Sequence, residues 1–155
     1  MSYSTSEIAR RLENIIRRGT IASVDAAKAR VTVKLGNIET APLPFLAQRA
    51  GDDRDWWCPS VGEQVLVHSE GGDFSNGVVL TGLYQAAHPA PMSDPKKSGT
   101  HFGDGATVIY DRQAHRYSVD LPSSGEIVLT VGASSLSIKN GSITLATPKF
   151  NGVQT

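Results

Sequence analysis

The sequence predicts an all-β protein that begins with a single helix. Apolar and polar residues alternate in many short runs, a pattern typical of strands with one buried face. Clusters of Gly, Ser and Asn separate these runs and predict turns. Helical spacing of apolar residues occurs at the N-terminus, within residues 4–18.

Composition limits the classes of function. The 155 residues carry a formal net charge of zero, which makes non-specific binding to nucleic acid or to an anionic membrane unfavourable. We therefore expect no nucleic-acid partner. Cys58 is the single cysteine, so no intrachain disulfide is possible. The N-terminus lacks the apolar segment of a signal peptide, and no stretch is apolar enough to span a membrane.

The N-terminal helix has recognisable start and stop signals. Ser4 and Glu7 fit a capping box, and Gly19 is expected to end the helix. The apolar residues fall on one stripe: Ile8, Leu12, Ile15 and Ile16. The helix is also basic, with Arg10, Arg11, Arg17 and Arg18. A solvated face that complements the helix dipole is favoured over an anionic partner.

Residues 19–84 predict a small barrel. Alternation within 21–24 and 31–35 indicates a hairpin, and further strands are expected at 65–68 and 78–83. Prolines 42 and 44 limit pairing of the intervening segment to a sheet edge. Roughly five short strands in this space fit a closed or partly closed barrel of the OB type, with a plain sandwich as the alternative.

The chain divides into three regions. Residues 1–87 form the helix and barrel domain, 88–98 a linker, and 99–155 a second β-rich region. The segment around the linker, "QAAHPAPMSDPKKSG", holds three prolines and no periodicity. In the third region strands are expected at 106–110 and 116–121, and Asn140-Gly141 predicts a tight turn.

The end of the third region raises a packing problem. Its alternating residues form one inward set: Ile127, Leu129, Val131, Leu136, Ile138, Ile143 and Leu145. Burying them yields roughly 10–20 kcal/mol, whereas ordering the backbone of the segment costs about 1–2 kcal/mol per residue. A single ribbon has no second layer, so it needs the barrel or other chains. The linker argues against folding back, so other copies of the chain would have to cover the apolar rows, and the spacing does not specify how many.

Four stretches carry a resemblance to a known family: "IIRRGTI", "QRAGDDRDWWCPSVGEQVLV", "GGDFSNGVVLTGLY" and "FGDGATVIYD". Together they resemble the central spike, or baseplate assembly protein V, of contractile phage tails and R-type pyocin-like particles. The resemblance implies a homotrimer in which three OB-fold domains form a collar and three tails intertwine as a triple-stranded β-helix. The inward set would then be the trimer core.

The resemblance also implies a function. The protein would be a structural spike of the tail baseplate, bound to hub and tail-tube proteins and driven through the outer membrane of the target bacterium when the sheath contracts. It would assemble in the host cytoplasm into a phage tail or a bacteriocin particle, and it would not be an enzyme. The outward residues Ser137, Lys139 and Thr144 fit a polar outer surface.

No cofactor is expected in this chain. Spikes of this family often end in a tip where an H-x-H motif from each of three chains binds a metal ion. The histidines here are His68, His88, His101 and His115, and none forms that motif. Truncation before the tip is favoured over capping by another protein, and a tip metal ion remains an expectation for a longer form.

Trp56 and Trp57 are candidate contacts for the collar or a partner, together with Arg17 and Arg18. The favoured alternative is that one or both tryptophans fill the barrel or pack between protomers. A further alternative function is an OB-fold module that binds single-stranded nucleic acid, or another ligand, by stacking.

Overall fold

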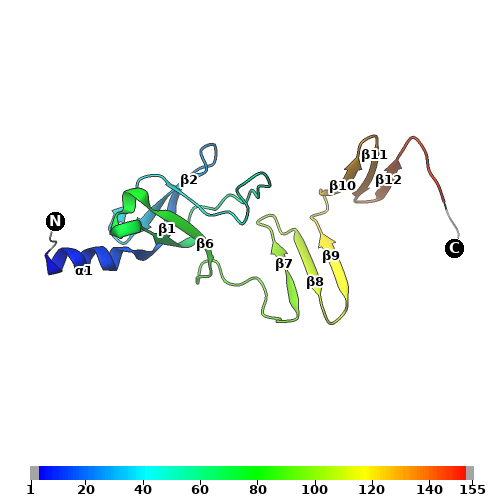
Figure 1. The fold of residues 1–155 in the computed structure, drawn as a ribbon. Coiled ribbons are helices and arrows are strands. Elements are labelled where there is room, and N and C mark those ends of the chain that lie inside the picture. The colour runs from blue at the N-terminus through cyan, green and yellow to red at the C-terminus, as the bar shows by residue number, and fades with distance from the viewer. Residues whose placement is uncertain (1–3, 153–155) are drawn as a thin grey trace. The chain divides into compact units, whose positions relative to one another are not determined.

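The computed structural model describes residues 4–152. The chain forms two compact units, Met1–Ala90 and Pro91–Thr155 (Figure 1). The division falls inside the segment that the sequence marks as a linker. Strands dominate both units, and α1 (Thr5–Asn14) is the single α-helix among the described residues. The all-β class and the N-terminal helix are therefore confirmed.

Unit 1 contains a curled sheet. Its strands are β1 (Ile16–Asp25), β2 (Arg30–Leu35), β3 (Ile38–Glu39), β4 (Leu43–Pro44), β5 (Gln64–His68) and β6 (Val78–Leu83). The sheet order is β3-β2-β1-β5-β6, and β4 pairs with β2. A parallel bridge from Phe45 to Val79 brings the end of β4 to β6. Strand β4, which pairs with β2 near one end of the order, is thereby linked to β6 at the other end, as a partly closed barrel requires.

The core of unit 1 consists of aliphatic side chains that alternate along these strands. Eight of them are 1% exposed or less: Ile21, Val31, Val33, Leu35, Leu43, Val65, Val67 and Val79. Two 3₁₀ turns, η1 (Glu70–Gly72) and η2 (Phe74–Asn76), connect β5 to β6. The alternation in the sequence thus identified the strands that build this core.

The helix ends earlier than the sequence predicted. Ser4 accepts a hydrogen bond from the Glu7 amide at 3.3 Å, so the predicted N-cap is present. The expected end at Gly19 is wrong, because the chain turns extended at Ile16 and pairs with β5. A β-carbon at Gly19 would overlap the Val33 side chain and the Lys34 carbonyl. Gly19 therefore allows close packing inside the barrel rather than a helix cap.

Unit 2 contains two three-stranded antiparallel sheets. The first joins β7 (Lys97–His101), β8 (Thr107–Asp111) and β9 (Arg116–Asp120), and the second joins β10 (Glu126–Val131), β11 (Ser134–Lys139) and β12 (Ser142–Ala146). Strand β7 was not predicted, and it begins two residues before the expected start of this region. The predicted turn at Asn140-Gly141 connects Lys139 to its partner Ser142.

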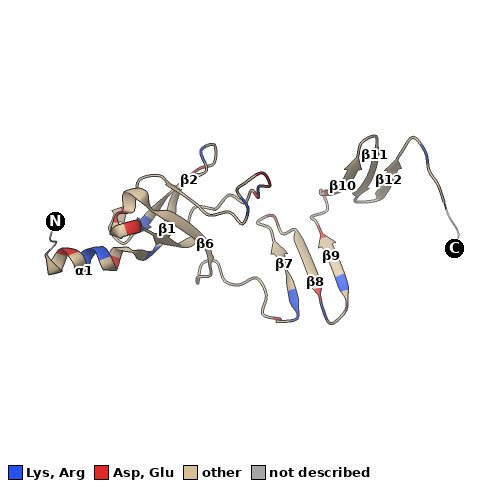
Figure 2. Cartoon of the chain, viewed as in Figure 1, with Lys and Arg blue, Asp and Glu red and all other residues tan. Residues whose placement is uncertain are grey.

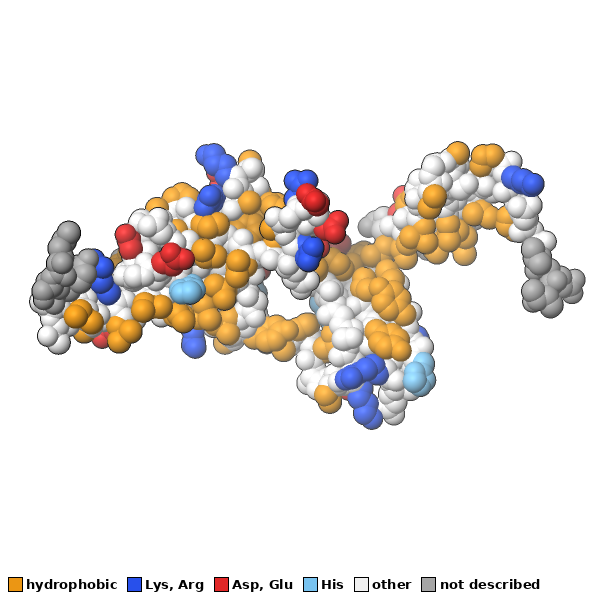
Figure 3. Space-filling model, in the orientation of Figure 1, with side chains coloured by type: hydrophobic (Ala, Val, Ile, Leu, Met, Phe, Trp, Pro, Cys, Tyr) orange, Lys and Arg blue, Asp and Glu red, His pale blue; other side chains and the backbone are white. Residues whose placement is uncertain are grey.

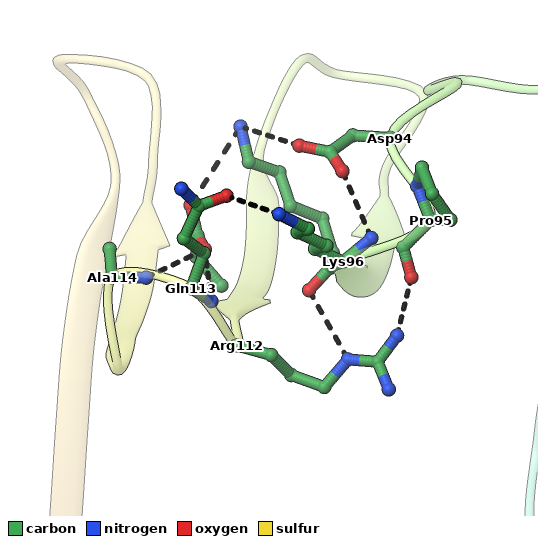
Figure 4. Close-up of polar contacts among 8 residues, drawn as sticks. Asp94, Pro95, Lys96, Arg112, Gln113 and Ala114 are labelled. Carbon is green, nitrogen blue, oxygen red and sulfur yellow. Dashed lines mark hydrogen bonds and ion pairs between the residues drawn. The ribbon is translucent and has the colours of Figure 1, made fainter.

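Polar contacts attach the start of β7 to the β8–β9 turn (Figure 4). The Arg112 guanidinium donates to the carbonyls of Pro95 and Lys96. The Lys96 ammonium donates to the Gln113 side chain at 2.9 Å, and Lys97 lies 3.9 Å from the Asp111 carboxylate. Polar contacts rather than apolar packing therefore hold this corner of unit 2.

Candidate interchain interface

Seven aliphatic residues of the second sheet lie on a single face. In an antiparallel sheet, residues directly opposite each other point to the same side. Ile138 pairs with both Ile127 and Ile143, and Leu136 pairs with both Leu129 and Leu145. Val131 follows in the same alternation along β10. The register thus places all seven residues of the predicted inward set on one surface, here called the shaft face.

The shaft face is largely open to water in a single chain. Val131 is 84% exposed, Ile143 74% and Leu129 63%, while Ile127 and Leu136 are half-buried. Hydrophobic side chains gather along one side of this sheet in Figure 3. Among the described residues of unit 2, only Ala106 is a buried hydrophobic residue. An apolar surface of this kind indicates an interaction site, because water must be removed from it for stability.

The opposite face of the same sheet is mostly polar, with Val128 as its large apolar residue. The Lys139 ammonium lies 3.3 Å from the Glu126 carboxylate, and the Ser137 hydroxyl donates to that carboxylate at 2.6 Å. The Ser137 hydrogen bond and the Lys139 charge lower the pKa of Glu126. Thr144 pairs with Ser137 on this face and is exposed. The sheet is therefore amphipathic, with one side suited to other chains and the other to water.

A second apolar surface was missed by the sequence reasoning. On the first sheet, Val108 pairs with Val119 and Tyr110 with Tyr117, so the four side chains share one face. Tyr117 is 68% exposed and Val119 40%. The three consecutive apolar residues of "VIY" concealed the side on which β8 is apolar, whereas the pairing with β9 reveals it.

The tryptophans do not fill the barrel. Trp56 is 61% exposed and Trp57 65%, and the Trp56 ring packs against Phe45 with centroids 6.2 Å apart. The expectation that they plug the barrel is therefore wrong, because the eight aliphatic residues already fill it. Their place between β4 and β5 leaves them available for contacts with another molecule.

Arg17 and Arg18 lie on β1 rather than on the helix. Arg17 donates to the Asn14 side chain at 3.0 Å, and Arg18 is exposed. Successive residues of a strand point to opposite faces, so these two arginines do not form one basic surface. The predicted basic helix is thereby reduced to Arg10 and Arg11, and both of these bind Glu7.

Two negative findings concern residues 4–152. In that range no three His, Cys, Asp or Glu side chains are grouped to hold a metal ion. None of the helices described there is long and apolar enough to cross a membrane.

A barrel domain joined to strands whose apolar face is exposed over the described residues defines a class of protein: a β-rich assembly subunit that shares its core with other chains. Comparison with known proteins agrees with a barrel domain followed by a trimerization region. Residues 17–84 match the "Type VI secretion system/phage-baseplate injector OB domain", and residues 99–153 match the "Gp138, beta helical trimerization domain".

A relative of known identity names the family. The chain is 35% identical over 149 residues to the spike protein of Escherichia phage P2. The aligned region covers 92% of this chain and 70% of the phage P2 protein. The chain belongs to the family of phage baseplate spike proteins. The resemblance stated from sequence, the OB-fold barrel and the β-helical region are thereby confirmed.

Proposed function

We propose that three copies of this chain form the membrane-piercing central spike of a contractile tail. The observation that carries the proposal is the exposed shaft face on a region that matches a trimerization domain. Around a threefold axis, the shaft face of each chain covers those of its two neighbours. Burial of seven aliphatic residues per chain then supplies the stabilisation that the single ribbon lacks.

The polar outer face suits passage through a membrane. With the shaft faces turned inward, the surface presents the Glu126–Lys139 ion pair and hydroxyl side chains such as those of Ser137 and Thr144. Polar groups of this kind partition poorly into lipid tails, so the shaft does not remain in the bilayer. Sheath contraction supplies the work of penetration, and the spike contributes stiffness and a narrow cross-section.

The remaining roles follow from this proposal. The collar binds the hub and tail-tube proteins, and the target is the bacterial outer membrane. The protein assembles in the host cytoplasm. Piercing requires no bond to be broken, so the chain acts without enzymatic activity, cofactor or nucleic acid.

Two measurements test the proposal. Light scattering at several concentrations should give a constant mass of three chains for the purified protein. Tail particles should then be added to bacteria that hold a β-lactamase in the periplasm, with hydrolysis of an impermeant chromogenic substrate as the signal of outer-membrane breach. Particles with this spike should give the signal. Particles that adsorb and contract without a trimeric spike should not, and an equal signal from them would contradict piercing.

A further inference from the structure

Helix α1 contacts the barrel through its polar side. A β-carbon at Gly72 of η1 would overlap the backbone of Arg11, which shows how closely helix and turn approach. Asn14 is 8% exposed on the same side. The apolar side of the helix points outward, with Ile8 55% and Leu12 68% exposed, and Ile16, the first residue of β1, is 60% exposed. We call these three residues the helix stripe. An amphipathic surface helix normally buries its apolar residues against the core, whereas these are exposed.

Unit 1 has another set of exposed apolar residues, in the segment between β4 and β5. Trp56 and Trp57 are exposed there together with Leu46 at 54% and Val61 at 61%. We call these four residues the tryptophan surface. The segment is held in place, because the Asp55 amide donates to the Arg49 carbonyl at 3.0 Å and Trp56 packs on Phe45. Ordered, exposed tryptophans are frequent anchors of protein interfaces.

The two surfaces cannot cover each other within one chain. Helix α1 lies at one end of unit 1, and the segment between β4 and β5 lies at the other (Figure 1). Their charges differ as well (Figure 2). Around the helix stripe are three arginines and two glutamates, because Arg17 points to the other face of β1: Arg10, Arg11, Arg18, Glu7 and Glu13. Beside the tryptophan surface, residues 49–55 hold three aspartates and two arginines.

Threefold symmetry gives these two surfaces a role. Contacts between neighbours in a cyclic trimer are heterologous, so each copy must present two different, complementary surfaces. Unit 1 presents two such surfaces, both apolar and of opposite net charge. Trimerization of unit 2 tethers three copies of unit 1, and tethering by a short linker raises their effective concentration to the order of millimolar. Even a weak contact then forms.

We propose that the helix stripe of one copy binds the tryptophan surface of the next copy, closing the three collar domains into a ring. This inference rests on the proposed homotrimer. It assigns Ile8, Leu12 and Trp56 to a collar interface that is separate from the shaft face. The arginines beside the stripe then face the neighbour's acidic 52–55 segment, which favours this pairing over contact between identical surfaces.

Tryptophan fluorescence tests the contact directly, because the chain contains two tryptophans and both lie on this surface. In the full-length Trp57→Phe chain, Trp56 alone reports. Leu12→Glu should raise the acrylamide quenching constant of Trp56 about twofold, because the neighbour's helix no longer shields the ring. The control Ile38→Glu alters a residue that is 51% exposed on β3 and should leave quenching unchanged.

Light scattering on the same samples separates the two proposals. A trimer whose Trp56 quenching does not respond to Leu12→Glu overturns the ring while leaving the spike intact. An equal response to Ile38→Glu also overturns it, since the effect would then not be specific to the helix stripe. A monomer before any substitution overturns the proposed homotrimer, and the ring with it.

Cross-linking gives an independent test of which surfaces meet. In a Cys58→Ala background, the pair Leu12→Cys and Trp56→Cys should yield covalent trimers with a short bismaleimide reagent. Neither single substitution should yield them, because a heterologous contact needs both residues. Cross-links from Leu12→Cys alone would show that identical surfaces meet, and an intact trimer without any cross-link would show that these two surfaces do not meet. Either result overturns the ring.

Discussion

The shaft face offers the sharpest test of the shared-core argument, through the substitution Ile143→Asp. Ile143 is 74% exposed in the single chain and lies opposite Ile138 in the register. The described residues of one chain leave most of this side chain uncovered, so we expect the monomer to tolerate an aspartate there. In the trimer the same position is buried near the axis, and three carboxylates approach one another. The substitution therefore separates trimer stability from monomer stability.

The magnitude follows from the area that only the trimer buries. Full burial of an isoleucine side chain contributes about 1.5–3 kcal/mol. The exposed 74% of Ile143 then corresponds to roughly 1–2 kcal/mol per chain, or roughly 3–7 kcal/mol per trimer. Loss of this term lowers the association constant by about 10²–10⁵. Burial raises the pKa of each introduced carboxyl, so the protonated form is favoured in the trimer and the defect shrinks as the pH falls toward 4.

Thr144→Asp is the matched control, because Thr144 is the next residue, is exposed and lies on the polar face. Sedimentation equilibrium over a hundredfold range of concentration should show dissociation for Ile143→Asp and an unchanged trimer for Thr144→Asp. Equal masses for the two variants, or a trimer of Ile143→Asp as stable as the unsubstituted chain, would refute the assignment of the shaft face to the trimer core.

Three further predictions concern features within each unit. Hydrogen bonds from Arg10, the larger contributor, and from Arg11 lower the pKa of Glu7 to about 2. An NMR titration of Glu7 should therefore place its midpoint well below the ordinary value. The stabilisation from these ion pairs is present above about pH 4.3 and is lost as the pH falls toward 2. A midpoint near 4.3 would contradict the pairing. Gly19→Ala should destabilise unit 1 by about 1–3 kcal/mol in thermal unfolding, because the added methyl overlaps the Val33 side chain, whereas Gly51→Ala, in open space, should have little effect. Arg112→Ala should speed hydrogen exchange at the Lys97 amide several-fold without changing the trimer mass, because the guanidinium that binds the Pro95 carbonyl is lost. Unchanged exchange would show that the remaining contacts hold the start of β7 without Arg112.

Much of the fold could be predicted because strand alternation survives in both units. The hairpin of β1 and β2 and the strands β5 and β6 follow the period-two pattern, and the buried positions are the apolar ones. The same pattern placed the shaft residues on one face, although five of the seven remain exposed among the described residues of a single chain. Periodicity records the side on which a strand is apolar, whichever chain covers it.

The errors arose where a local signal competed with tertiary pairing. Residues 16–18 continue the helical pattern of α1, yet hydrogen bonding of β1 to β5 takes them into the sheet. Strand β7, "KSGTH", contains no strongly apolar residue, so its sequence carries no alternation. It is a strand because β8 offers it hydrogen bonds and the Arg112 contacts hold its start. Pairing partners distant in sequence decided both segments.

The distribution of buried residues suggests an order of assembly. Unit 1 holds all eight residues of the hydrophobic core, so we expect it to fold in a single chain, whereas Ala106 is the one buried hydrophobic residue in the described part of unit 2. Trimerization of the shaft is therefore coupled to its ordering, so its rate depends on chain concentration, while barrel folding is independent of it. A collar that folds first also exposes the helix stripe and the tryptophan surface first. If these surfaces meet as inferred, the ring gathers three chains before their shafts intertwine, and Leu12→Glu should slow trimer formation more than it weakens the finished trimer.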